Sequence, residues 1–451
     1  MRSRAPNPVA SLRPEQPGPV ADSGTVAIHT HGCKLNQADS NVLARQFQAA
    51  GYRLVDSVVE ADVFVLNTCT VTANADAKAR QALRAARRRN PRAFIVAAGC
   101  YPQRAEPELT RMEAVSLVVG NSEKDRLVSL VLAARGQASN LPLSDQTPLP
   151  LTLTPPQTGR SRAMLKIQEG CNQVCAYCIV PKVRGREQSI HPDVLVGQIQ
   201  QRAAEGFQEV VLTGTQLGSY GFDIPGTSLR KLLRRILAET EIPRLRVSSL
   251  QPQEISPALL DLYQDSRLCP HFHIPLQSGS DPILRAMRRR YNTELFARTV
   301  DLVRCALPGA GITADLILGF PGEGSAEYAE TRDFVSAIGF SDLHIFPYSR
   351  RPGTSAAYLP EQVPEPVKKE RVTEMLQVAR QGFEAFRQQQ VGQVRPVLWE
   401  SKRRALHKSV LNGLTDNYIR VHAESGPDLS NVIAPARLLE LEGDSVRTGI
   451  V

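Results

Sequence analysis

The sequence lacks any long hydrophobic run: no window of about 18 continuous apolar residues occurs in it, which excludes a membrane-spanning helix. Its first twenty residues carry charge but no apolar core, so they do not resemble a secretory signal, and we expect a cytoplasmic protein without a membrane partner. Aromatic residues are also few, at 5%. Hydrophobic residues make up 42% and charged residues 22%, an ordinary globular balance that excludes large-scale disorder and a collagen-like fibre.

Cysteines are few, eight in 451 residues, and in a cytoplasmic chain they argue against structural disulfides. Cys171, Cys175 and Cys178 form one C-x-x-x-C-x-x-C run, a spacing that chance rarely produces. Three thiolates can hold three irons of a cubane cluster and leave the fourth iron open to a small ligand. A structural zinc site needs four ligands, and the nearest candidate, His191, lies thirteen residues beyond Cys178. An open iron–sulfur cluster is therefore favoured over zinc.

The order of apolar runs predicts an α/β fold in three domains. Strand-like runs at 25–31, 62–68, 93–99 and 117–120 alternate with helical patterns, which is typical of a doubly wound parallel sheet. The predicted division is a flexible tail at 1–24, a first domain at 25–136, a linker at 137–160, a second domain at 161–386 and a third at 387–451.

The second domain carries six further strand-like runs separated by helical patterns. They lie at 163–170, 209–214, 244–250, 271–277, 312–320 and 342–348. Six such units predict a partial (β/α)6 barrel, whose chemistry sits at the C-terminal ends of the strands. A helix is predicted over 365–390, and short alternating runs beyond it, at 394–400, 406–413 and 417–423, predict a small all-β barrel.

Three dispersed cysteines, Cys33, Cys69 and Cys100, each follow a predicted strand of the first domain. Carboxyl ends of parallel strands share one edge of a sheet, so these thiols can meet at a second cluster. Taken one by one, each could instead be a small buried hydrophobe. Cys269 and Cys305 have no spacing partner, and we expect both in the core.

Around these cysteines the sequence resembles the radical S-adenosylmethionine (SAM) methylthiotransferase family. The resemblance is carried by LKIQEGCNQVCAYCIVPKVRGREQS at 165–189, HIPLQSGSDPILRAMRRRY at 273–291 and DLILGFPGE at 315–323, and it extends over about 25–450. It implies two 4Fe–4S clusters, an auxiliary one on Cys33, Cys69 and Cys100 and one on the 171–178 loop that chelates SAM. Reduction there cleaves SAM to a 5′-deoxyadenosyl radical, and a methylated sulfur is delivered from the auxiliary cluster.

The same resemblance implies which residues contact the cofactor and which partners the enzyme needs. The candidate cofactor contacts are Tyr177, Thr213, Gly214, Thr215, Gln216, Gln277, Ser278 and Asp315. A helix cap or polar strand end explains Gln277 and Ser278 equally well, and Asn36 and Asn67 either shape the auxiliary pocket or act as ordinary turn residues. An electron donor such as flavodoxin or ferredoxin, a sulfur donor and a monomeric state are expected.

Positive charge points to nucleic acid: 54 basic residues oppose 45 acidic ones, a net charge of +9. The terminal β segment resembles the TRAM domain, an RNA-binding barrel, with Trp399 and Tyr418 beside basic residues. The candidate RNA contacts are Arg84, Arg88, Lys402, Arg403, Arg404 and Arg420. Solvated surface explains the charges nearly as well, and barrel core is the better account of Trp399.

The stretch GCKLNQADS at 32–40 is most similar to the branch that acts on N6-threonylcarbamoyladenosine next to the tRNA anticodon. The branch acting on isopentenyladenosine and the branch acting on a ribosomal-protein aspartate are the alternatives. From other classes, an electron carrier is disfavoured because it needs no substrate barrel or RNA module and its clusters normally have four ligands. An RNA-binding protein without catalysis is disfavoured because all six thiols are present.

Overall fold

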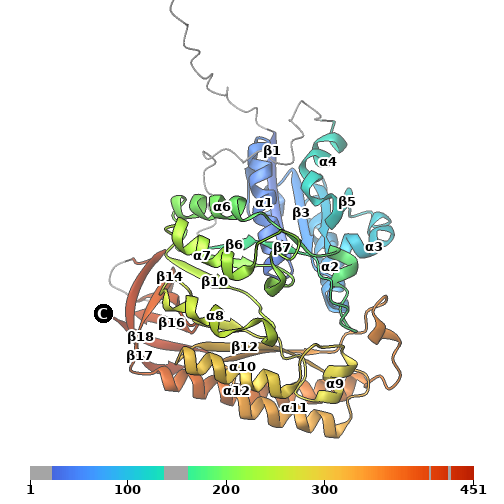
Figure 1. Cartoon of the computed structure of the whole chain (residues 1–451). Coiled ribbons are helices and arrows are strands. Elements are labelled where there is room, and N and C mark those ends of the chain that lie inside the picture. The colour runs from blue at the N-terminus through green and yellow to red at the C-terminus, as the bar shows by residue number, and fades with distance from the viewer. Residues whose placement is uncertain (1–22, 137–160, 406–407, 425–427) are drawn as a thin grey trace, which may run out of the picture.

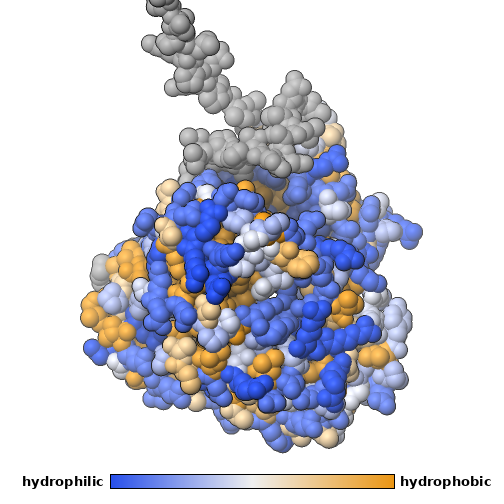
Figure 2. Space-filling model, viewed as in Figure 1, coloured by the Kyte–Doolittle hydropathy of each residue, from blue (hydrophilic) through white to orange (hydrophobic). Residues whose placement is uncertain are grey.

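The computed structural model describes residues 23–136, 161–405, 408–424 and 428–451, and side chains at 402–409 are not among the described ones. The tail expected at 1–24, except its last two residues, and the linker expected at 137–160 lie outside these ranges. Figure 1 shows an α/β protein whose last part is a β-barrel, as predicted. Among the described residues, no helix combines the length and hydropathy needed to cross a bilayer, and the face in Figure 2 is largely hydrophilic.

The first domain is a parallel sheet with strand order β2-β1-β3-β4-β5. Its strands are β1 (Gly24–His31), β2 (Tyr52–Leu54), β3 (Val63–Thr68), β4 (Phe94–Gly99) and β5 (Leu117–Gly120). Its helices are α1 (Lys34–Ala49), α2 (Ala73–Arg89), α3 (Cys100–Thr110) and α4 (Leu127–Ala134). One face of β3 packs against α2 and α3 through Phe64 and Leu66, and the other against α1 and α4 through Val63 and Val65. Helices on both faces confirm the doubly wound arrangement.

One strand and one α-helix of the first domain escaped the sequence patterns. Strand β2 has three residues, too few for a period of two to be visible. Helix α3 contains Pro107 and a kink at Ala105 (φ −139°), so its apolar positions keep no single helical phase. Helix α1 begins at Lys34, directly after the first of the three dispersed cysteines, Cys33, because Cys33 serves as its N-cap and Asn36 accepts a hydrogen bond from the Cys33 amide.

The second domain contains six parallel strands, as predicted, in the order β6-β9-β10 and β11-β12-β13, joined by isolated bridges such as Ser249–His273. The strands are β6 (Arg162–Lys166), β9 (Glu209–Thr213), β10 (Arg244–Val247), β11 (His271–His273), β12 (Gly311–Leu318) and β13 (Asp342–Pro347), with a hairpin of β7 (Gln168–Glu169) and β8 (Gln188–Ser189). The helices are α5 (Val180–Arg184), α6 (Pro192–Ala204), α7 (Leu229–Glu239), α8 (Pro257–Leu260), α9 (Asp281–Ala286), α10 (Thr293–Ala306), α11 (Ser325–Ile338) and α12 (Glu365–Gln390).

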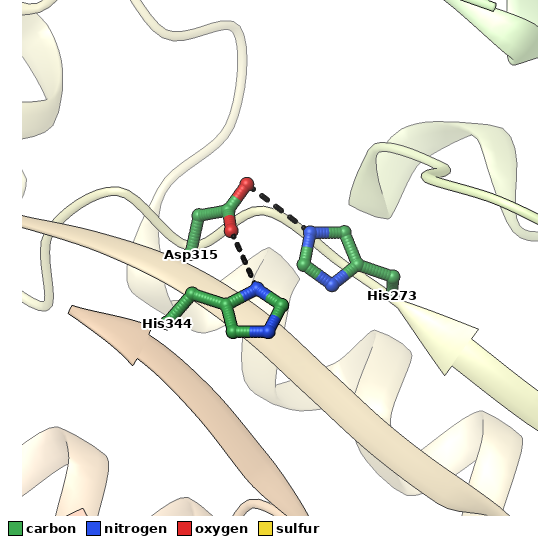
Figure 3. Close-up of side chains that lie close together, drawn as sticks. All are labelled: His273, Asp315 and His344. Carbon is green, nitrogen blue, oxygen red and sulfur yellow. Dashed lines mark hydrogen bonds and ion pairs between the residues drawn. The ribbon is translucent and has the colours of Figure 1, made fainter. Parts of the chain in front are cut away.

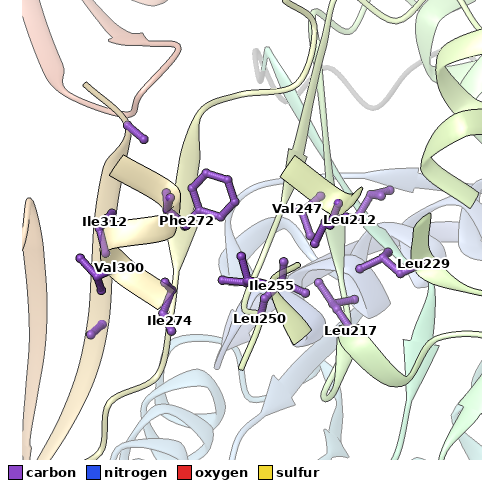
Figure 4. Packing of buried hydrophobic residues seen from close by; sticks show 14 of the residues in the cluster. Leu212, Leu217, Leu229, Val247, Leu250, Ile255, Phe272, Ile274, Val300 and Ile312 are labelled. Atoms are coloured by element: carbon purple, nitrogen blue, oxygen red, sulfur yellow. The ribbon is translucent and has the colours of Figure 1, made fainter. Parts of the chain in front are cut away.

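Alternation along these strands divides the barrel into an apolar outside and a polar inside. Ile312 and Phe272 belong to the large core that the strands form with the surrounding helices, for example with Val300 of α10 (Figure 4). The intervening side chains, such as Asp315 and His273, point away from that core. The concave side of the barrel is therefore free for chemistry.

The third domain is a closed barrel of strands in the order β14-β15-β16-β18-β17. Its strands are β14 (Val394–Ala405), β15 (Lys408–Thr415), β16 (Arg420–Glu424), β17 (Val432–Glu442) and β18 (Ser445–Ile450). Trp399 is fully buried at its centre. The expectation of a buried cysteine is met by Cys269 but is wrong for Cys305, which is exposed. Cys305 lies two residues after the buried Val303 of α10, and two residues along a helix turn the side chain to the opposite face.

Candidate active site

Strand register brings the three dispersed cysteines to one edge of the first sheet. His31 pairs with Thr68 and Thr68 with Gly99, so the chain leaves three neighbouring strands at the same level. Cys69 and Cys100 follow at once, and the Cys69 amide donates to the His31 carbonyl at 2.7 Å. Burial, together with the nearby Cys33 and Cys100, raises the pKa of the Cys69 thiol to about 12.

Two asparagines hold this edge in shape. Asn36 donates from Nδ2 to Asn67 Oδ1 at 3.2 Å, and Asn67 donates from Nδ2 to the Asn36 carbonyl at 2.9 Å. A Cβ at Gly99 would lie 2.5 Å from Asn67 Oδ1, and Gly99 has φ +99°, so glycine is required there. Asn36 is both a cap residue of α1 and part of the wall behind the thiols.

The C-x-x-x-C-x-x-C loop follows β7 and is held by the residues that end α5 and α9. The Cys171 amide donates to the Gly185 carbonyl at 3.1 Å, and the Ala176 amide to the Met287 carbonyl at 3.0 Å. Arg289 donates from Nη1 to Cys175 Sγ at 3.2 Å. The sequence alone gives Arg289 no role, because it lies between Arg288 and Arg290 and nothing local distinguishes it from these two neighbours.

The two groups of cysteines are neighbours across helix α5, which begins two residues after Cys178. Cys100 packs in a small buried cluster with Ile179 and Val183 of this region. Asn121 donates from the same Nδ2 to Cys100 Sγ at 3.3 Å and to the Val183 carbonyl at 2.7 Å. The first domain therefore presents its thiols directly beside the loop of the second.

N–H groups donate to sulfur atoms in both groups of cysteines. Cys69 Sγ accepts from the Val71 amide at 3.4 Å, and Cys171 Sγ accepts from the Gln173 amide at 3.4 Å. Such N–H···S bonds suit the negative charge of metal-bound thiolates and set the potential of iron–sulfur clusters. The three thiols of each group of cysteines, together with the N–H groups that donate to them, therefore fit the ligation of an iron–sulfur cluster.

The predicted cofactor residues at the end of β9 lie against the start of the cysteine loop. Gln168 accepts at Oε1 from the amides of Thr215 and Gln216, both at 3.0 Å, and donates from Nε2 to the Gly170 carbonyl at 2.9 Å. Gln216 accepts at Oε1 from Gln251 Nε2 at 2.6 Å. Thr213, Gly214, Thr215 and Gln216 are thus brought beside the loop, with Gln168, which the sequence patterns missed, as their support.

Of the remaining predicted residues, Gln277 and Ser278 have clear local partners. Gln277 has φ +68°, and its amide donates to the Asp315 carbonyl at 2.8 Å, so it continues the sheet beyond β11. Ser278 is fully buried, and its hydroxyl accepts from the Ser280 amide at 3.2 Å and lies 3.3 Å from Thr331 Oγ1. The polar groups of Ser278 are therefore used within the turn itself. Tyr177 packs partly buried beside the small core below the cysteine loop.

Asp315 lies inside the barrel between two histidines (Figure 3). Its Oδ2 is 3.1 Å from His273 Nε2, and its Oδ1 is 3.2 Å from His344 Nδ1. Burial opposes ionisation of Asp315, but the hydrogen bonds from both histidines hold its pKa well below the usual range. Asp315 in turn raises the pKa of His344. The sequence patterns did not identify His273 and His344 as site residues. Each could have been found from the alternation of polar and apolar residues in HFH at 271–273 and DLH at 342–344.

Lys34 and Tyr418 enter the barrel from the two flanking domains. The charges of Arg246 and Asp315 both act on Lys34, the first residue of α1, and burial followed by Arg246 lowers the pKa of Lys34 to about 7. Tyr418 stacks 4.0 Å below the Arg246 guanidinium, and its hydroxyl donates to Glu209. Its ring also lies 4.6 Å from that of His271. Tyr418 therefore closes the base of the barrel instead of facing RNA.

Both parts of this site match family models. The model for "Uncharacterized protein family UPF0004" matches residues 25–120, and the model for the radical SAM superfamily matches 165–335. Along 437 residues, the chain is 36% identical to a protein of Bacillus subtilis named threonylcarbamoyladenosine tRNA methylthiotransferase MtaB, covering 94% of this chain and 96% of the relative. The chain belongs to the radical SAM methylthiotransferase family.

Two other comparisons bear on branch and fold. The tRNA-2-methylthio-N(6)-dimethylallyladenosine synthase of Syntrophotalea carbinolica is 32% identical over 91% of this chain and 96% of its own length. Among solved structures, the radical S-adenosylmethionine methyltransferase TsrM from Kitasatospora setae, with cobalamin and a [4Fe-4S] cluster bound, has a TM-score of 0.52 at 16% identity, covering 74% of this chain and 77% of that one. The latter shows a shared fold.

In this radical SAM methylthiotransferase, the predicted RNA contacts are scattered over two domains. Arg84 and Arg88 are exposed on α2 and available to a ligand. The neighbouring arginines of α2 are engaged within the protein: Arg80 donates to the Tyr101 hydroxyl and Arg87 to the Ala93 carbonyl. Arg420 is exposed at the start of β16. The backbone of Lys402, Arg403 and Arg404 forms part of β14, but their side chains lie outside the described ones.

Proposed function

We propose that this methylthiotransferase converts N6-threonylcarbamoyladenosine, immediately 3′ of the tRNA anticodon, to its 2-methylthio derivative. The observation that carries this proposal is the closeness of the two three-cysteine groups: Cys100 packs on Ile179, which directly follows Cys178, and on Val183 of α5. A radical is required because the C2–H bond of adenine is inert to ordinary acid–base catalysts. The greater identity to the Bacillus subtilis relative, 36% against 32%, favours the threonylcarbamoyl branch over the dimethylallyl branch.

In this proposal Cys171, Cys175 and Cys178 hold one 4Fe–4S cluster, and Cys33, Cys69 and Cys100 hold the auxiliary one. Bound together, the clusters and SAM supply the radical and the methylthio group. The protein's own part is positional: Arg289 donates to Cys175 Sγ, and Gln168 keeps the end of β9 beside the loop. Tyr177, Thr213, Gly214, Thr215, Gln216, Gln277, Ser278 and Asp315 are the proposed cofactor contacts.

The proposal extends to partners and to domain roles. The first (25–136), second (161–386) and third (387–451) domains would bind the auxiliary cluster, SAM and RNA respectively. The anticodon stem-loop would meet the exposed Arg84, Arg88 and Arg420 together with the basic 402–404 segment of a TRAM-like barrel. An electron donor such as flavodoxin or ferredoxin and a sulfur donor act in the cytoplasm on a monomeric enzyme.

Mass spectrometry of tRNA nucleosides tests this function. A strain that lacks the gene should lose 2-methylthio-N6-threonylcarbamoyladenosine alone, and the wild-type gene should restore it. Cys69→Ala should fail to restore it, whereas the matched control Cys305→Ala, an exposed cysteine on α10, should restore it fully. Loss of the isopentenyl counterpart would reassign the branch, and unchanged nucleosides would refute the function.

A further inference from the structure

The segment 349–356, between β13 and α12, contacts both groups of cysteines. On one side, Arg351 donates from Nη2 to Thr70 Oγ1 at 2.7 Å, in the loop after β3 that carries an auxiliary thiol. On the other side, the Ala356 amide donates to the Ala176 carbonyl at 2.8 Å, inside the C-x-x-x-C-x-x-C loop. Both alanines are buried in the small core below that loop. One short segment therefore links the surroundings of the two proposed clusters.

Arg351 reaches a buried polar cluster in the first domain. Its side chain is 3% exposed, and the same Nη2 lies 2.7 Å from Asp76 Oδ2 on α2. Thr70, which directly follows Cys69, donates from Oγ1 to Asp76 Oδ1 at 2.6 Å. Hydrogen bonds between ionised groups are the strong ones, and burial shields this one from water. One guanidinium group of the second domain therefore holds the loop behind Cys69.

Arg104 makes matching contacts from within the first domain. It donates from Nε to Thr70 Oγ1 at 2.9 Å and from Nη2 to Asp76 Oδ2 at 2.7 Å. Arg104 lies on α3, the helix that begins at Cys100. The two arginines therefore share their acceptors and differ in the domain that supplies them, because Arg351 crosses the junction and Arg104 does not.

We propose that Arg351 is a positioning residue, which sets the separation between the auxiliary cysteines and the loop that binds SAM. This inference rests on the proposed function. Product formation requires C2 of the base to reach the radical source at one group of cysteines and the methylated sulfur at the other. A misplacement of about 1 Å lowers the rate of such a reaction by about a hundredfold. Cleavage of SAM takes place at the loop alone, so it does not depend on this separation.

The test measures iron content, 5′-deoxyadenosine release and methylthio product in reconstituted Arg351→Gln, with an anticodon stem-loop RNA that carries N6-threonylcarbamoyladenosine as the substrate. Asp76 keeps Arg104 as a partner in this variant, so the buried carboxylate stays paired. Iron and 5′-deoxyadenosine should remain close to the wild-type amounts, whereas the ratio of product to 5′-deoxyadenosine should fall by about tenfold to a hundredfold. The ratio should fall less in Arg351→Lys, which keeps the charge but not the planar fork.

Arg104→Gln is the matched control, because it removes hydrogen bonds to the same two acceptors and leaves the junction intact. Its ratio of product to 5′-deoxyadenosine should stay close to that of the wild type. Electron paramagnetic resonance of the two reduced clusters gives a second readout, since the magnetic interaction between two clusters depends on their separation. That interaction should change in Arg351→Gln and stay unchanged in Arg104→Gln.

The outcomes separate this inference from the function beneath it. An unchanged ratio in Arg351→Gln, or equal falls in Arg351→Gln and Arg104→Gln, overturns the inference alone. Iron loss from folded Arg351→Gln also overturns it, because Arg351 then supports the assembly of a cluster instead of its position. A wild-type enzyme that makes no methylthio product overturns the proposed function as well.

Where Arg351→Gln does not fold, Ser349→Ala decides. Ser349 Oγ accepts from the Ala73 amide at 3.0 Å, across the same junction between the segment 349–356 and the first domain. The ratio of product to 5′-deoxyadenosine should fall in this variant too, and an unchanged ratio overturns the inference.

Discussion

Asp39 of α1 joins the first and second domains, and replacing it with Asn should weaken that junction strongly. Its carboxylate lies 2.6 Å from Lys124 Nζ, 3.0 Å from Lys166 Nζ and 3.3 Å from Arg184 Nη2. The side chains of Asp39 and Arg184 are each 2% exposed, and that of Lys124 is 7% exposed. Despite its burial, ion pairs led by Lys124 hold the Asp39 pKa well below the usual range, so the carboxylate is ionised at neutral pH.

Glu169 limits the damage on one side of this network. It still pairs with Lys166 and Arg184 in the variant, whereas Lys124 keeps no carboxylate partner among the described residues. Removing one member of a buried pair costs about 3–5 kcal/mol, and the surviving Glu169 contacts place the cost near the lower end, about 3 kcal/mol. At a urea slope of about 3 kcal/mol per molar, the unfolding midpoint should fall by about 1 M.

The assay is urea unfolding of the reconstituted holoenzyme at pH 7 under anaerobic conditions, followed by circular dichroism. The matched control is Asp193→Asn, which breaks an ion pair with Arg235 whose two side chains are 67% and 38% exposed. This exposed pair is screened by water, so the control midpoint should stay close to that of the wild type. Equal midpoints for Asp39→Asn and Asp193→Asn would refute the argument from burial.

Three further predictions follow from the site and the core. Cys175→Ala should lower iron from about eight to about four atoms per chain and abolish the release of 5′-deoxyadenosine. Cys69→Ala should lose as much iron and still release 5′-deoxyadenosine, but it should make no methylthio product. Methylthio product from Cys69→Ala would contradict the assignment of the auxiliary cluster. By NMR, the pKa of His344 should lie above its ordinary value of 6.5 and should fall in Asp315→Asn. Because the pKa is raised in the folded state, the stabilisation by the His344–Asp315 pair is complete below pH 6.5 and is lost as the pH rises through the raised value. An unchanged pKa of His344 in Asp315→Asn would contradict this prediction. Trp399→Ala should destabilise the third domain by about 3–5 kcal/mol in urea unfolding, since Trp399 is fully buried, and a shift below about 1 kcal/mol would show that its core is not packed around that ring.

Local patterns in the sequence predicted much of the fold because the spacing of apolar residues shows which face of a helix or strand is buried. Helix α12 and strand β5 begin and end at the predicted residues, 365–390 and 117–120. At α2 the start is marked by Thr72, whose side chain accepts from the Ala75 amide at 3.1 Å. The six strands of the second domain follow from apolar runs of strand length separated by helical periods.

The sequence alone also determined the chemistry of the cysteine loop, since Cys171, Cys175 and Cys178 lie within eight consecutive residues and need no long-range contact to meet. Only the tertiary structure decided what surrounds them. Lys34, Arg246 and Tyr418 come from three domains: Tyr418 stacks on Arg246 inside one barrel, and the charge of Arg246 acts on Lys34. The spacing of apolar residues shows that a side chain is buried, but it does not show which distant segment buries it. Lys34 at a helix start, Arg246 in a strand and Tyr418 in a turn therefore share no pattern in the sequence, and only the packed chain brings them together.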